Sequence, residues 1–135
     1  MKRTAIIINK NLPFGEQANV IAIVSAALAN ATEDMIDSEK IIDLNGNKHA
    51  AIKNSLVILK SNPTALLTLT ETVNELDSVE SVVFTSKGQR LNNQFSDYKI
   101  EISTNELKNL EPVVVALYGE DEQIRTLTKK FSLLR

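Results

Sequence analysis

The feature that most constrains this fold is a strand-then-helix pattern that occurs near both ends of the chain. Residues 4–9 form a continuous apolar run rich in β-branched side chains, which leads through a turn at 12–15 into an apolar segment. Residues 112–118 form a similar run that meets Gly119 before another helical segment. A strand that is apolar at every position is buried on both faces, which predicts a sheet covered by helices. Folds of this kind keep their binding sites at the strand ends.

Capping and turn residues divide the chain between these two units. The first run is followed by a helix predicted over residues 16–30. Asn45-Gly46 supplies the positive φ angles of a tight turn and predicts a small hairpin. A second strand is predicted over 55–59, and Asn62-Pro63 marks the start of a second helix, because Asn caps and Pro is tolerated at the first helical position. A third strand is predicted over 80–85.

The segment 86–111 is the least regular part of the pattern. Residues 95–102 carry an apolar stripe at helical spacing, and Ser-Thr-Asn-Glu at 103–106 matches a capping box that opens a short helix. Pro112 then begins the fourth strand, and the last helix follows Gly119. The whole pattern predicts an α/β fold with four core strands in a single domain, residues 1–135.

Composition limits the class of protein. The chain has 135 residues, of which 43% are hydrophobic and 24% are charged, as is typical of one soluble domain. A net charge of −2 argues against a nucleic-acid partner. The absence of cysteine excludes disulfides and suits a cytoplasmic location. The apolar runs are shorter than the ~20 residues that cross a bilayer, so we expect no membrane partner.

The predicted first helix is apolar nearly all round at residues 20–29. A helix of that kind is covered on more than one side. Either another element of the same chain or a second copy provides the cover. We therefore expect a homodimer to contribute, and a purely structural dimer is one hypothesis for the function.

We expect a ligand-binding rim where the first strand meets its helix, because free N–H groups at a helix start donate hydrogen bonds to anions. The candidate ligand-binding residues are Asn9, Lys10, Asn11, Gly15 and Asn19, with His49 and Tyr118 if their loops converge on the same place. Asn19 has the alternative role of bonding to backbone at the start of the helix.

Few residues in the sequence are candidates for catalysis or for binding a metal or cofactor. His49 is the only histidine, and it is a candidate proton-transfer group beside Asp43 or else a turn residue bonded to local backbone. Ser86 and Lys87 follow the third strand as a possible nucleophile and base, whereas residues 87–90 could hold an anion or form an exposed loop. We expect no metal, because one His and no Cys leave only carboxylates, and no cofactor, because no glycine-rich phosphate loop is present. Catalytic residues remain unassigned.

Several motifs together resemble a known family. They lie at residues 12–15 with 18–19, at 43–49, at 115–119 and at 127–128 with 133–135, so the resemblance covers nearly the whole chain and is weakest over 86–111. The chain resembles the domain-of-unknown-function family two thousand, which is grouped by fold with peptidyl-tRNA hydrolase II. The resemblance implies a three-layer α/β/α sandwich around a four-stranded mixed sheet, often dimeric.

Two functions follow from these observations. The leading hypothesis is a binding or regulatory domain for a small polar or anionic ligand near Asn9, Lys10, Gly15, Asn19 and His49. The alternative is an esterase similar to peptidyl-tRNA hydrolase with a replaced catalytic set, using His49 or Lys10 as base. The true hydrolases carry an aspartate-leucine pair where this chain has Asn11-Leu12, and their catalytic lysine has no clear counterpart here. Whether the protein is an enzyme stays open.

Overall fold

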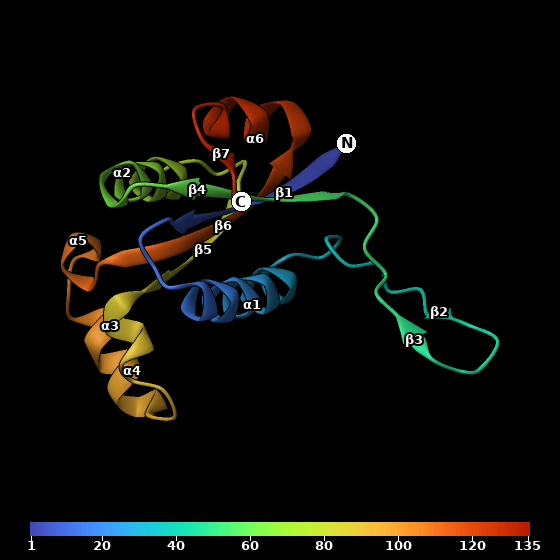
Figure 1. Cartoon of the computed structure of the whole chain (residues 1–135), viewed down its shortest axis with the longest axis horizontal. Helices are drawn as coiled ribbons and strands as arrows, with labels where there is room; N and C mark the ends of the chain where they lie inside the picture. Colours follow the sequence, from blue (N-terminus) through green and yellow to red (C-terminus); the bar gives the residue numbers. More distant parts are fainter.

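The computed structural model describes residues 1–135 and has a mixed sheet between two layers of helices (Figure 1). No helix in it is both long enough and apolar enough to cross a membrane. In chain order the elements are β1 (Lys2–Asn9), α1 (Phe14–Ala31), β2 (Ile41–Ile42), β3 (Lys48–His49), β4 (Ser55–Ser61), α2 (Pro63–Asn74), β5 (Glu80–Thr85), α3 (Ser86–Gln89), α4 (Phe95–Ser103), α5 (Leu107–Leu110), β6 (Pro112–Glu120), α6 (Asp121–Thr128) and β7 (Ser132–Leu133).

The central sheet has five strands in the order β5-β6-β1-β4-β7, where the sequence predicts four. β1 lies in the middle, parallel to β4 and antiparallel to β6. The extra strand is β7, whose two residues pair antiparallel with Leu59 and Lys60 of β4. So short a strand leaves no periodic signal in the sequence, and it forms because the end of the chain folds back along the open edge of β4.

The side chains on the two faces of β1 pack into two separate cores, which explains why the strand is apolar at every position. Ile6 and Ile8 pack in a cluster with Val20, Val24 and Leu28 of α1. On the other face, Ala5 and Ile7 pack in a cluster that includes side chains from α2 and α6. Figure 1 shows α1 on one side of the sheet and α2 with α6 on the other, so the three-layer α/β/α arrangement is present.

Only one face of α1 is covered within the chain. Val20, Val24 and Leu28 are fully buried, at the spacing of one helical stripe. Ala22 and Ala26 are exposed, and Ile23 is 38% exposed. The helix spans two residues more at its start than predicted, which places Gly15 inside its first turn.

The segment after β5 departs most from the sequence pattern. The predicted capping box at 103–106 is wrong: Ser103 ends α4, and Glu106 precedes α5 without a side-chain hydrogen bond. The short helix predicted before Pro112 is present as α5, but it begins after Glu106 rather than after Ser103, because Thr104 bonds back to Ile100 at the end of α4. Gly88 is required by packing, since a Cβ there would lie 2.9 Å from the Tyr98 ring.

Residues 32–54, which we call the arm, project from the body between α1 and β4 (Figure 1). The predicted hairpin is present as β2 and β3, and Gly46 has φ +86°. The chain reverses over five residues, 43–47, rather than in a two-residue turn. The Asp43 carboxylate accepts hydrogen bonds from the backbone N–H groups of Asn45 and Asn47 at 2.9 and 3.0 Å, which widens the turn into a stable loop.

Candidate functional site

The strand ends form two contrasting edges of the sheet. The carboxyl edge, as we define it, contains the ends of β1, β4 and β5 and the start of β6. The parallel strands β1 and β4 are neighbours there, and the Lys10 backbone N–H donates to the Ser61 carbonyl at 2.9 Å. Their helices α1 and α2 cover opposite faces of the sheet. Such a point, where the connections diverge, is where open α/β sheets place their ligand crevices.

A cavity of about 230 Å³ lies on one side of the start of α2, and we call it the lysine cavity. Lys10, Lys60 and Lys130 line it together with Ser61, Asn62 and Phe131. No carboxylate lines the cavity, and none of the three lysines has an ion-pair partner. The Lys130 ammonium lies 5.4 Å from the centre of the Phe131 ring. The result is unneutralised positive charge in a chain whose net charge is −2.

A larger cavity of about 390 Å³ lies on the other side of the start of α2. We call it the Ser86 cavity, and its walls include Asn9, Leu12, Thr64, Ser86 and Glu111. The linings of the two cavities lie near each other, because Asn9 is followed directly by Lys10 and Asn62 directly by Pro63, with one member of each pair in each lining. The carboxyl edge therefore combines one strongly cationic cavity with one of mixed polarity.

The residues predicted for the rim divide among several places. Asn9 lines the Ser86 cavity and Lys10 the lysine cavity. Gly15 and Asn19 line a third hollow of about 340 Å³ between α1 and α3. Asn11 is exposed, and its backbone N–H donates to Asn9 Oδ1 at 2.9 Å. These residues share the first strand-to-helix connection but not a single cavity.

His49 and Tyr118 do not join the rim. His49 lies on the arm, where its Nε2 is 2.9 Å from Asp43 Oδ2. This contact, followed by the Asn47 N–H, lowers the pKa of the exposed Asp43 carboxyl to about 2. Tyr118 pairs with Thr4, near the opposite end of β1 from Asn9. The conditional prediction that these loops converge is not met, because the arm and the carboxyl edge lie at different ends of the sheet (Figure 1).

Tyr118 has a structural environment of its own. Its hydroxyl donates to Asp34 Oδ1 at 3.0 Å and its side chain is buried. Burial, followed by the neighbouring Asp34 carboxylate, raises the pKa of Tyr118 to about 12. Met35, beside Asp34, is buried in the α1-side core. These contacts fix the base of the arm to the body.

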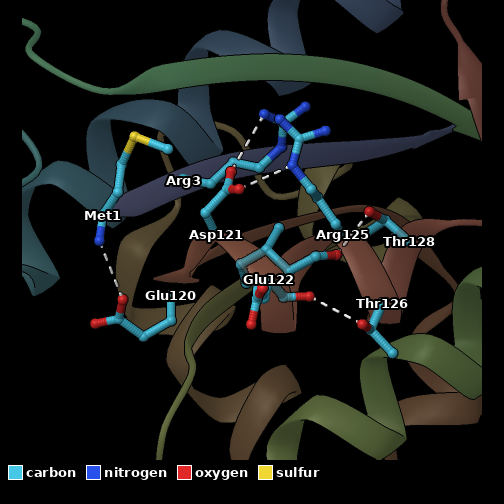
Figure 2. A network of polar contacts seen from close by, with 9 residues as sticks. Met1, Arg3, Glu120, Asp121, Glu122, Arg125, Thr126 and Thr128 are labelled. Atoms are coloured by element: carbon cyan, nitrogen blue, oxygen red, sulfur yellow. Dashed lines mark hydrogen bonds and ion pairs between the residues drawn. The ribbon is translucent and has the colours of Figure 1, made fainter.

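The amino edge, at the start of β1 and the end of β6, is neutralised by ion pairs (Figure 2). Asp121 lies 3.6 Å from Arg3 Nη1 and accepts a hydrogen bond from Arg125 Nε at 2.9 Å. Glu120 contacts the Met1 amino group at 3.4 Å and Lys2 at 3.3 Å. Each of these charges has a partner, unlike the lysines at the carboxyl edge.

The sequence pattern missed Lys60 and Lys130 as site residues. In the sequence, Lys130 lies near the end of the last predicted helix, and Lys60 follows a predicted strand. They come together because Lys60 pairs with Ser132 across the β4–β7 ladder. No three His, Cys, Asp or Glu side chains are grouped as a metal would need.

The comparisons with known proteins identify the family. Residues 2–135 match the family described as Protein of unknown function (DUF2000), and the chain belongs to it. The fold is similar to that of the protein of unknown function Atu0240 from Agrobacterium tumefaciens strain C58, with a TM-score of 0.85 and 18% identity. That similarity covers 99% of this chain and 98% of the other. No protein with a curated description matches the chain.

Proposed function

We propose that this protein binds a small ligand through an anionic group held in the lysine cavity. The observation that carries the proposal is the set of Lys10, Lys60 and Lys130 around one cavity with no carboxylate among its lining residues. Three like charges repel one another unless an anion or solvent counterions lie between them. The Asn62 side chain caps α2 through its Oδ1, and its amide N–H₂ adds a hydrogen-bond donor beside them. A phosphate or carboxylate satisfies both needs.

The location of the cavity supports the same proposal. It lies at the divergence point between β1 and β4, where ligands of α/β sheets are bound through the strand-to-helix loops. Its volume of about 230 Å³ is below the ~300–1,000 Å³ of whole-ligand pockets. The lysine cavity therefore suits an anionic group of a ligand rather than an entire metabolite.

The test is a titration with inorganic phosphate followed by two-dimensional NMR of the labelled protein. We expect saturable shifts of the amide signals of Lys10, Ser61 and Asn62, weakened by added salt. Lys60→Ala and Lys130→Ala should each raise the dissociation constant. Lys48→Ala is the matched control, because it removes the same charge from an exposed position on the arm. Equal weakening by Lys48→Ala would show that only net charge matters and would refute a defined site.

An esterase that acts on aminoacyl or peptidyl esters, with a peptidyl-tRNA hydrolase II-like fold, is the second candidate function. Of its two proposed bases, Lys10 lies at the carboxyl edge and His49 lies on the arm. The proposal therefore favours Lys10, with Ser61 in the same cavity. Release of peptide from peptidyl-tRNA by the protein and by Lys10→Ala decides it. Turnover that depends on Lys10 supports the esterase, and absence of turnover removes it.

A homodimer in the cytoplasm remains part of the proposal. The exposed α1 face around Ala22, Ile23 and Ala26 supports a subunit contact, and the cysteine-free composition suits a reducing compartment. Ile23→Asp tests the contact by sedimentation, with Asn30→Asp as an exposed control on the same helix. Val24 is unsuitable for this purpose, because it is fully buried against the sheet and a charge there would unfold the monomer.

A further inference from the structure

The Ser86 cavity has a size and polarity that the lysine cavity lacks. Its volume of about 390 Å³ lies within the ~300–1,000 Å³ of small-molecule pockets. Leu12, Leu67 and Val113 give it aliphatic walls, and Asn9, Thr64 and Ser86 bring polar groups from three separate elements. Lys108 and Glu111 also line it, and each is paired within the chain, with Glu106 and Lys87 respectively. A pocket whose charges are already paired suits a neutral group that has both a nonpolar surface and hydrogen-bonding atoms.

Two of these polar residues keep hydrogen-bonding atoms free for a ligand. Ser86 Oγ, by contrast, is enclosed by protein atoms and has no hydrogen-bond partner, so it belongs to the wall and does not contact a ligand. Asn9 uses its Oδ1 to accept from the Asn11 N–H, and its amide nitrogen and the Thr64 hydroxyl make no side-chain hydrogen bond. Hydroxyl and amide groups of this kind both donate to and accept from hydroxyl groups of a ligand.

The wall of the cavity also contains the chain's clearest backbone strain. Glu111 has φ +62° and ψ +79°, in the left-handed region that non-glycine residues seldom adopt. It precedes Pro112, the first residue of β6, and it lines the cavity. Strained residues of this kind concentrate at ligand-binding sites, where the surrounding structure holds them in place.

We propose that the Ser86 cavity binds the neutral part of a ligand whose phosphate lies in the nearby lysine cavity, and that this ligand is a small sugar phosphate or polyol phosphate. The proposal rests on the proposed function. Consecutive residues divide the two linings, so one ligand a few bonds long can reach both. No aromatic residue lines the Ser86 cavity, which leaves no stacking surface for a nucleobase and favours a nonaromatic, hydroxyl-rich group.

The experiment compares dissociation constants for inorganic phosphate, glycerol 3-phosphate, ribose 5-phosphate and glucose 6-phosphate by calorimetry and NMR. Two added neutral hydrogen bonds are worth about ten-fold in affinity, so we expect at least one organic phosphate to bind about ten-fold more tightly than inorganic phosphate. Equal affinities for all four probes would overturn the proposal and leave the anion site standing. No binding of any probe would instead overturn the proposed function itself.

Variants test whether the ten-fold gain in affinity over inorganic phosphate comes from the Ser86 cavity. Thr64→Trp places a large side chain at an exposed position of its wall, and it should abolish the ten-fold gain while leaving inorganic phosphate binding unchanged. Thr72→Trp is the matched control on α2 outside both cavities and should leave the gain intact. A gain that survives Thr64→Trp would place the neutral group elsewhere and overturn the inference.

Discussion

The two edges of the central sheet carry similar charged residues but treat them differently. At the amino edge, Arg3 and Asp121 are only 13% and 18% exposed and contact each other, and Glu120 has two cationic partners. At the carboxyl edge, Lys10, Lys60 and Lys130 surround a cavity without a carboxylate. Paired charges stabilise the fold, whereas unpaired like charges weaken it unless a ligand neutralises them. The difference separates an edge whose charges are paired within the chain from the edge that we propose binds a ligand.

The largest expected effect follows from removing the central acid of the amino edge. Asp121→Ala leaves Arg3 and Arg125 without their shared partner, and we expect the free energy of unfolding to fall by about 2 kcal/mol. Urea denaturation measures the change. Glu122→Ala is the control, because it removes the same charge from the next, exposed residue and should change stability by less than about 0.5 kcal/mol. Phosphate affinity should stay unchanged, and a loss of binding would contradict the separation of the two edges.

The second prediction makes the carboxyl edge resemble the amino edge. Ala65 lines the lysine cavity at the third position of α2, three residues after the Asn62 cap. Ala65→Glu should supply an internal counterion and complete a capping box, raising stability by about 0.5 kcal/mol. The same carboxylate should compete with phosphate and weaken its binding by about ten-fold. Ala65→Gln separates charge from bulk, since it should leave most of the binding intact; equal losses would attribute the effect to steric blocking.

The extent to which the fold could be predicted depends on how local its signals were. The apolar strand at β1 and the Asn62-Pro63 start of α2 were correct because burial on both faces and capping each leave a mark on neighbouring residues. The same holds for the bounds of β5, which match the prediction. By contrast, β7 was missed, and α5 was predicted but begins after Glu106 instead of after Ser103. Their positions depend on which distant surface the chain meets, and the local propensity of two to four residues cannot encode that choice.

The candidate site was predictable to a smaller extent for the same reason. Asn9 and Lys10 were found because they lie at the end of the first buried strand, a position that any α/β sheet exposes. Lys60 and Lys130 are far apart in the sequence and meet only through the β4–β7 pairing. His49 was selected for its chemistry, but its place on the arm depends on the course of residues 32–54. Residue chemistry indicated the kind of site, and tertiary pairing determined its members.

The third prediction concerns strain at the carboxyl edge. Glu111→Gly removes the penalty of a left-handed backbone at the wall of the Ser86 cavity, and we expect stability to rise by about 0.5–1 kcal/mol. The comparison is Glu106→Gly, at an ordinary φ of −73°, which should be neutral or destabilising. Thermal unfolding measures the stability of the two variants relative to the unchanged protein. If Glu111→Gly also destabilises, the Glu111 side chain contributes more through its 3.7 Å contact with Lys87 than its backbone costs.

The smallest effect is expected on the arm, which belongs to neither edge. The pKa of Asp43 is lowered to about 2 from its ordinary 3.8, chiefly by His49 and then by the Asn47 N–H. Because the folded-state pKa is the lower one, the ionised carboxylate stabilises the loop above about pH 4, and this stabilisation is lost as the pH falls through about 2. Carbon-13 NMR of the Asp43 carboxyl should show that midpoint, and His49→Ala should raise it. Lys48→Ala changes a neighbouring charge without touching the contact and should leave it in place. The amide signals of β1 and β4 should not follow this titration, since the turn lies outside both cores; a coupled shift at the carboxyl edge would connect the arm to the binding site after all.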